Sequence, residues 1–182
     1  MRQLLLTKKI MVLAVLALAF QTGVRATETF VVFEPASGSW KLSNPTISLA
    51  DGEHSCVRWA AANLAADFGK VTGTEATVTS LTSHLSPLTS KNILIGTVGV
   101  NPQIDQWVKQ GALRDLKGKT EKYLIKTIGN QLVIAGSDKR GTVYGIYELS
   151  RQIGVSPWYY WADVPVEKHT SLYIKEGEYT DG

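Results

Sequence analysis

The sequence predicts one α/β domain of the α+β type, in which about three helices pack on a mixed β-sheet. Short apolar runs of strand length alternate along the chain with longer helical patterns. Two strand-like runs, residues 123–128 and 131–135, flank Gly129-Asn130, which is a hairpin signal and argues against a purely parallel sheet. The 182 residues are 44% hydrophobic and 19% charged, a composition and length that suffice for one folded domain with its own core.

The first half of the chain predicts two short strands followed by a long helix. The strands are residues 29–33 and 46–49, and a turn at residues 35–39 separates them. Asp51 is expected to cap the helix by accepting backbone N–H bonds, and Gly73 is expected to end it. Between these two residues one apolar stripe recurs at the α-helical period. The stripe consists of Val57, Ala60, Ala61, Leu64, Phe68 and Val71.

Two further strands and a second helix are expected in the middle of the chain. Residues 76–81 alternate as a half-buried strand does, whereas residues 92–95 form a short apolar run typical of a central strand. Asn101-Pro102 indicates a helix start, because a capping residue is followed by proline at the first helical position. Gly111 is expected to end this helix. Its buried face is predicted to consist of Ile104, Trp107 and Val108.

A third helix is predicted over residues 138–153, after the hairpin and with Ser137 or Asp138 as its cap. Gly141 and Gly145 lie one turn apart in this helix, and each costs about 1 kcal/mol of helix propensity relative to alanine. We therefore expect another backbone to approach the helix closely at these glycines. Residues 171–174 are expected to form the last strand. The buried face of the third helix is predicted to consist of Val143, Ile146, Ser150 and Ile153.

The N-terminus reads as a secretory signal peptide rather than as part of the fold. Lys8 and Lys9 precede an apolar run over residues 10–20, and Val24-Arg-Ala26 resembles a cleavage site after residue 26. Removing residues 1–26 takes away four basic residues and no acidic one, which lowers the formal net charge from +3 to −1. The mature domain then has no basic excess for holding phosphates, so nucleic-acid binding is disfavoured.

Patterns that indicate cofactor or metal sites are incomplete in this chain. Gly96-Thr-Val-Gly99 follows a strand and precedes a helix, but it lacks the third glycine of a dinucleotide loop and is interpreted as a plain turn. His54, His84 and His169 lack the spacing of metal ligands and are expected to be surface or capping residues. Cys56 is the only cysteine, so it forms no intrachain disulfide, and we expect it to be a small, partly buried apolar residue.

No residue of this sequence is assigned a catalytic role. The chain has no G-x-S-x-G elbow, and its acidic residues show no context that suggests an acid/base pair. Asp138 is better explained by the dipole of the helix that it precedes. Glu148 is expected on a solvated face or in an i, i+3 pair with Arg151.

Four consecutive aromatic residues, Trp158-Tyr159-Tyr160-Trp161, are the strongest candidate for a binding surface. They bury a large area within the chain or against a partner domain, or they stack on the C–H faces of sugars. Arg140 stands at the start of a helix, where a cation is mildly unfavourable. We therefore expect its guanidinium to contact a carboxylate of substrate, an acid of an adjoining domain, or solvent. The candidate substrate-binding or interface residues are Arg140, Trp158, Tyr160 and Trp161.

Two segments carry a resemblance to a known family. They are Ala135-Gly-Ser-Asp-Lys-Arg-Gly-Thr-Val-Tyr-Gly-Ile-Tyr147 and Ser156-Pro-Trp-Tyr-Tyr-Trp-Ala-Asp-Val-Pro165. From about residue 132 to residue 166 the chain resembles the N-terminal accessory domain of glycoside hydrolase family 115, the xylan α-glucuronidases. A looser likeness extends to the accessory domains of family 67 α-glucuronidases and family 20 hexosaminidases.

The resemblance implies an inverting enzyme that removes 4-O-methylglucuronic or glucuronic acid from xylan at the loops of a (β/α)₈ barrel. Such a barrel needs about 250 residues, and fewer than thirty follow residue 153. The expected organisation is therefore a signal peptide over residues 1–26 and an exported accessory domain over residues 27–182, inactive alone. Its expected partners are a barrel beyond Gly182 and, through the whole enzyme, glucuronoxylan in the periplasm or outside the cell. The alternative is a stand-alone carbohydrate-binding or interaction module.

Overall fold

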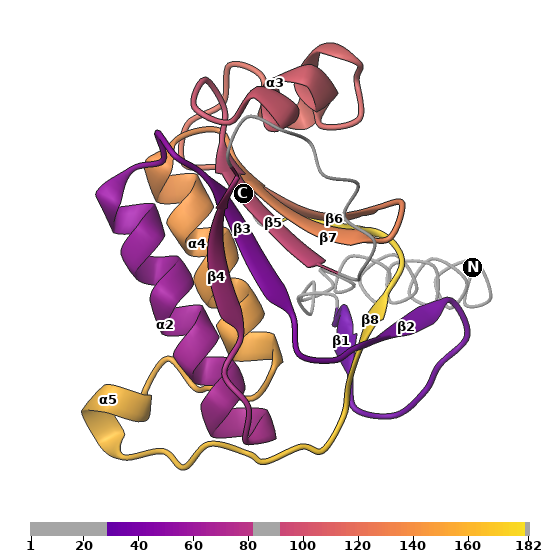
Figure 1. Ribbon diagram of the computed structural model, residues 1–182, viewed down its shortest axis with the longest axis vertical. Helices are drawn as coiled ribbons and strands as arrows, with labels where there is room; N and C mark the ends of the chain where they lie inside the picture. Colours follow the sequence, from indigo (N-terminus) through magenta and orange to yellow (C-terminus); the bar gives the residue numbers. More distant parts are fainter. Residues whose placement is uncertain (1–28, 82–91, 181–182) are drawn as a thin grey trace, which may run out of the picture.

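A six-stranded mixed sheet is the centre of the molecule in the computed structural model, which describes residues 29–81 and 92–180 (Figure 1). The predicted signal peptide and His84 lie outside these described residues. The order of the strands is β4-β3-β5-β7-β6-β9, and the first four are parallel. β6 runs antiparallel to both of its neighbours. The strands are β3 (Thr46–Ala50), β4 (Thr77–Leu81), β5 (Asn92–Thr97), β6 (Tyr123–Ile128), β7 (Gln131–Gly136) and β9 (Glu178–Tyr179).

The central position of β5 agrees with its apolar sequence. All six of its residues are buried, because β3 and β7 flank it and helices cover both faces of the sheet. The predicted hairpin is also confirmed. In the β6–β7 pair Ile128 stands opposite Gln131, and Gly129 takes a positive φ of 59° in the two-residue turn between them.

A small second sheet was not expected from the sequence. It is antiparallel, with the order β1-β8-β2, and its strands are β1 (Val31–Val32), β2 (Ser39–Leu42) and β8 (Leu172–Lys175). The strand predicted at residues 171–174 is β8, but it is not the last one, because β9 follows it. β2 escaped sequence reasoning because its four residues follow a turn directly. The Gln152 side chain joins this sheet to the helix layer, since its Oε1 accepts the backbone N–H groups of Phe30 (2.9 Å) and Val31 (3.3 Å).

The first described helix, α2 (Ser55–Thr72), buries the predicted apolar stripe and ends at Gly73, whose φ is 83°. The prediction that Asp51 caps it is wrong. The helix begins four residues after Asp51, His54 occupies the N-cap position, and no side chain caps the first turn. The neighbouring Glu53 side chain instead accepts the N–H of His54 at 3.0 Å.

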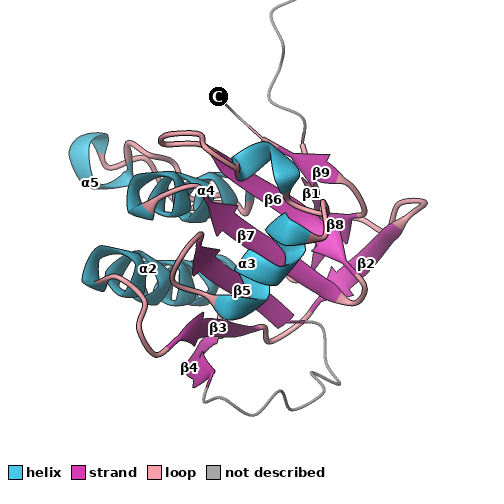
Figure 2. Cartoon of the chain, turned by 90° about the horizontal axis from the view of Figure 1, so that it is seen from above, coloured by secondary structure: helices cyan, strands magenta, loops and turns pink. Residues whose placement is uncertain are grey.

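Helices cover the two faces of the large sheet unequally. α2 and α4 (Lys139–Gln152) lie side by side on one face, whereas the short α3 (Pro102–Lys109) and the 3₁₀ turn η1 (Arg114–Leu116) lie on the other (Figure 2). Asn101 caps α3 as predicted, because its Oδ1 accepts the N–H groups of Gln103 and Ile104. The smaller core under α3 consists of Leu94, Ile104, Leu113, Leu116, Leu124, Val133 and Ala135.

Asp138 is the N-cap of α4, as the sequence predicts. One carboxylate oxygen accepts the N–H groups of Arg140 (3.0 Å) and Gly141 (2.9 Å), and the other accepts the N–H of Glu121 (2.7 Å). Partial desolvation raises the pKa of Asp138, but the three N–H bonds and the charge of Arg140 outweigh it and hold the pKa below its ordinary value of 3.8.

Close backbone approach is confirmed at Gly141. A Cβ on this residue would lie 2.3 Å from the carbonyl oxygen of Lys122. Gly136, at the end of β7, is equally restricted, since its Cβ would lie 2.1 Å from the backbone nitrogen of Thr142. At Gly145 the nearest atoms belong instead to the side chains of Ile134 and Tyr123, so no backbone approaches there.

Replacing Asp138 with alanine should destabilise the protein by about 1–2 kcal/mol at neutral pH, because α4 loses its cap. A carboxylate whose folded pKa is lowered stabilises the fold only while it is ionised. The difference between wild type and Asp138→Ala should therefore shrink as the pH falls below 3.8. Urea unfolding followed by circular dichroism over a pH series measures both effects. Asp138→Asn keeps an acceptor oxygen and should lose less; equal stability of Asp138→Ala and wild type at neutral pH would contradict this role.

Gly141→Ala should destabilise the protein by about 2–3 kcal/mol, although alanine normally favours a helix, because the added methyl group collides with fixed backbone. The matched control is Gly69→Ala in α2, where the nearest atom to the new methyl group is the side-chain Cγ of the exposed Glu75. That side chain can move, so this variant should stay within about 1 kcal/mol of wild type. Thermal unfolding of both variants is the measurement, and similar stabilities for the two would refute the backbone contact.

Candidate functional site

Large exposed aromatic side chains occur on α2, on α4 and in the segment that follows α4. Single exposed apolar residues are normal, whereas a group of them marks an interaction surface. We call the group the outer aromatic residues. They are Trp59 (73% exposed), Tyr144 (41%), Tyr147 (46%), Trp158 (64%) and Trp161 (85%).

The solvent-facing side of α2 carries almost no charge over its first three turns. Its fully exposed positions between residues 55 and 66 are Ser55, Cys56, Trp59 and Ala62. Arg58 lies on the same stretch, but its guanidinium donates to the backbone carbonyls of Glu53 and Asp51. A surface helix usually presents charged residues to water, so this side of α2 is composed as a contact surface.

Cys56 differs from its predicted environment. The sequence interpretation made it a partly buried residue, but it is an exposed free thiol. The stripe that begins at Val57 faces the sheet, and this places the preceding residue on the outer side of α2.

The aromatic run after α4 folds into the short helix α5 (Tyr159–Ala162). Tyr159 anchors this helix, because its ring packs against the main core and the ammonium group of Lys70 lies 4.9 Å from the ring centre. Trp158 and Trp161 point to solvent instead. The side chain of Tyr160 lies outside the part that the structure describes.

The predicted site residues do not form one cluster. Arg140 lies in the first turn of α4, whereas Trp158 and Trp161 follow its last turn. A helix of 14 residues is about 21 Å long, which separates the arginine from the tryptophans.

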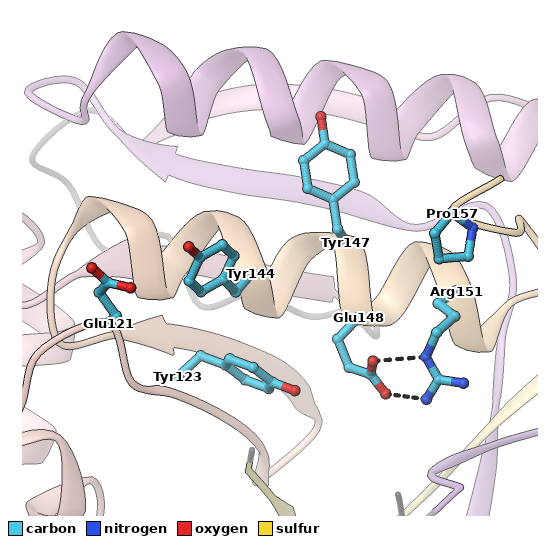
Figure 3. Close-up of a pocket in the computed structure, with 7 residues that line it drawn as sticks. All are labelled: Glu121, Tyr123, Tyr144, Tyr147, Glu148, Arg151 and Pro157. Carbon is cyan, nitrogen blue, oxygen red and sulfur yellow. Dashed lines mark hydrogen bonds and ion pairs between the residues drawn. The ribbon is translucent and has the colours of Figure 1, made fainter. Parts of the chain in front are cut away.

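An open groove of about 440 Å³ lies along α4, on the side of this helix that carries Tyr144 and faces Tyr123 of β6 (Figure 3). We call it the α4 groove. Sequence reasoning did not find it, although Tyr144 and Tyr147 follow Arg140 by four and seven residues and so share its side of a helix. The lining residues are Glu121, Tyr123, Tyr144, Tyr147, Glu148, Arg151 and Pro157.

Each end of the α4 groove carries an ion pair. Beside its N-terminal end Arg140 contacts Glu121 (Nη1 to Oε1, 2.7 Å) and donates to the Tyr144 hydroxyl (2.9 Å). The hydrogen bond to Tyr144 and then the charge of Glu121 raise the pKa of Arg140. The carboxylate that the sequence required for this arginine thus comes from the same chain.

At the C-terminal end of the α4 groove the predicted i, i+3 pair is confirmed. Arg151 donates to Glu148 through Nε (2.8 Å) and Nη2 (2.6 Å), and Gln152 donates to the same carboxylate at 2.8 Å. Tyr147 points the other way, toward α2, where its hydroxyl accepts a bond from Asn63 (3.0 Å) (Figure 3).

The carboxyl edge of the parallel strands, where open α/β sheets usually bind ligands, is filled by the protein's own side chains. The buried Glu53 carboxylate accepts the N–H (3.1 Å) and the hydroxyl (2.8 Å) of Thr97 at the end of β5. The Thr97 hydroxyl also lies 2.8 Å from that of Thr142. The N–H of Gly99 donates to Asp105 at 2.7 Å. Because carboxylates already occupy these amides, the segment after β5 is a strand-to-helix turn and not a phosphate loop.

The remaining candidate chemistry is sparse in the described residues. Within residues 29–81 and 92–180 no three His, Cys, Asp or Glu side chains are grouped as metal ligands. His169 stacks on Phe33 with ring centres 3.4 Å apart, and His54 is exposed at the start of α2. None of the helices that the structure describes has the length and apolar character needed to span a bilayer.

Comparisons with known proteins agree with this architecture. The family model described as glycosyl hydrolase family 67 N-terminus matches residues 41–149, which is more than half of the chain. A solved family GH115 4-O-methyl-α-glucuronidase with specificity for decorated arabinogalactans is similar over 79% of this chain, with 30% identity and a TM-score of 0.62. The match covers 18% of that enzyme, so the chain spans less than a fifth of its length. Comparison with curated protein sequences gives no match.

Weaker structural matches also occur. One is a family GH20 β-N-acetylhexosaminidase from Streptomyces coelicolor, with 18% identity, a TM-score of 0.47 and coverage of 82% of this chain and 24% of that one. Another is a chitobiase from Flavobacterium johnsoniae, with 15% identity, a TM-score of 0.46 and coverage of 84% and 19%. The resemblance to the accessory domains of families 115 and 67 is therefore confirmed, and the chain belongs to the family of glycosyl hydrolase family 67 N-terminal domains.

Proposed function

We propose that this domain is a non-catalytic accessory part of a carbohydrate-active hydrolase, and that its exposed tryptophans Trp59, Trp158 and Trp161 dock a catalytic domain. The observation that carries the proposal is the exposure of Trp59, Trp158 and Trp161, together with the near absence of charge on the solvent-facing side of α2 over its first three turns. Such rings lose their unfavourable contact with water when a second domain covers them. The family suggests a catalytic domain as the partner, because it is a family of N-terminal domains of glycosyl hydrolases. The segment of the similar α-glucuronidase that this chain matches is less than a fifth of that enzyme.

The acids of the α4 groove support a non-catalytic role. Glycoside hydrolysis usually needs two carboxyl groups that act on one bond as acid and as base or nucleophile. Glu121 is bound to Arg140, and Glu148 is bound to Arg151 and Gln152. Their oxygens are engaged within the domain, which favours a structural part for both residues.

The proposed reaction of the whole enzyme is removal of glucuronic or 4-O-methylglucuronic acid from a plant polysaccharide. The similar enzyme is named for decorated arabinogalactans. Xylan is the substrate that the family 115 resemblance of residues 132–166 implies. The proposed type of reaction is the same for either polymer.

A second function rests on the same exposed indoles. Trp158 precedes α5 directly and Trp161 lies within it, and both side chains are exposed to solvent. This arrangement suits a stand-alone carbohydrate-binding module. The two functions differ in the ligand of these rings: a protein domain in the first case, a sugar chain in the second.

Export is a further part of the proposal. Residues 1–26 have the charged start, apolar run and small-residue cleavage signal of a secretory leader. Mass spectrometry of the protein from its native host should identify Thr27 as the first residue, in a periplasmic or culture fraction. An intact Met1 in a cytoplasmic fraction would overturn this assignment.

Docking is tested by titrating the purified chain with a family GH115 catalytic domain that lacks its own N-terminal part, followed by calorimetry. Trp59→Ser and Trp161→Ser should each weaken binding at least about tenfold, or 1.4 kcal/mol, since buried tryptophans dominate interface energies. The matched control is Val78→Ser, which alters an exposed apolar residue on the edge strand β4 and should leave binding unchanged. If all three variants bind the catalytic domain as tightly as wild type does, the interface lies elsewhere on the domain.

A further inference from the structure

The α4 groove has a built geometry that domain docking does not use. Its floor is Tyr123, which lies against the helix because Gly145 has no side chain; a Cβ there would lie 3.2 Å from that of Tyr123. Tyr144 forms an exposed wall, and its hydroxyl is fixed by Arg140 at 2.9 Å. Tyr123, Glu148 and Arg151 lie together on one side of α4, whereas Tyr147 extends toward α2 (Figure 3).

The charges along the α4 groove cancel. Arg140 pairs with Glu121 at one end and Arg151 pairs with Glu148 at the other. The two arginines are eleven positions apart, which is about 16 Å along a helix axis. A ligand with net charge therefore gains little here over water, because each guanidinium already faces a carboxylate.

The ion pairs still present hydrogen-bonding atoms to the groove. A carboxylate has more acceptor sites than its arginine partner fills, and a guanidinium has five N–H donors. An apolar protein surface laid over the groove would take these groups out of water without replacing their hydrogen bonds. A ligand with many hydroxyls replaces them.

We propose that the α4 groove binds a neutral oligosaccharide. One face of a sugar ring packs its C–H groups on the Tyr144 ring, and hydroxyls along the oligosaccharide bond to the Glu121–Arg140 pair at one end and to the Glu148–Arg151 pair at the other. A groove that is open rather than enclosed suits an internal part of a polysaccharide. The domain then keeps the uncharged backbone of a decorated polysaccharide close to an enzyme that acts on its acidic side groups. This biological role rests on the proposed function, whereas the binding of a neutral sugar does not.

The test is calorimetric titration of the purified chain with xylotetraose, with a neutral galacto-oligosaccharide, and with polygalacturonate as the anionic probe. At least one neutral sugar should bind in the millimolar range or tighter, and more tightly than polygalacturonate. Tyr144→Ala should weaken this binding at least tenfold. Tyr144→Phe keeps the ring and should stay within threefold of wild type. Circular dichroism checks that each variant is folded.

The matched control is Val78→Ala, because it shortens an equally exposed apolar side chain (41% exposed, as Tyr144 is) outside the groove. Its sugar affinity should equal that of wild type. Absence of heat with both neutral sugars would overturn the proposal, as would tighter binding of polygalacturonate. Loss of binding in Trp161→Ala but not in Tyr144→Ala would assign the sugar to the tryptophans instead. None of these results changes the docking titration, which reports on Trp59 and Trp161 with a protein ligand.

Discussion

The close contact between the first turn of α4 and the chain that enters β6 is the constraint on which the rest of the structure depends. Gly141 lets the Lys122 carbonyl approach the helix, and the same carbonyl accepts the N–H of Ser137 at 2.8 Å. The Ser137 hydroxyl accepts the N–H of Lys122 in return, and Asp138 accepts that of Glu121. These bonds fix α4 along β6. They therefore place Glu121 beside Arg140, and they place Tyr123 and Tyr144 so that both line the α4 groove.

Polar groups are distributed differently at the carboxyl edge of the sheet and on the outer side of the helix layer. At the carboxyl edge of the sheet Glu53 bonds to Thr97 and Thr97 bonds to Thr142, so these groups are already engaged within the protein. A buried carboxylate is stable there only because three donors satisfy it, from His54 and twice from Thr97. The outer side of α2 and α4 has the opposite character, with exposed rings and few unpaired charges. The usual ligand position of an α/β fold is thus internally bonded here, whereas the helix layer leaves large rings exposed.

Local sequence patterns predicted the elements well where one residue decides the outcome. Asn101 and Asp138 cap their helices, Gly73 ends α2, and Gly129-Asn130 turns the hairpin, because each conformation depends on the chemistry of that residue and its near neighbours. The prediction that Asp51 caps α2 failed because of a tertiary contact. The buried network around Glu53 holds that residue at the start of α2, and the helix begins beyond the reach of the Asp51 side chain.

The sequence by itself determined the order of the main strands and helices and the buried stripe of α2, since these follow from periodicity, capping and glycine positions within short stretches of chain. Its resemblance over residues 132–166 pointed to the family. The sequence also identified Trp158 and Trp161 as unusual. Only the tertiary structure decided that β1, β2 and β8 form a second sheet, that Arg140 pairs with Glu121, and that Tyr123 and Tyr144 line one groove. The physical reason is that such pairs join residues far apart in the chain, and their energies are set by packing and distance, which no local pattern encodes.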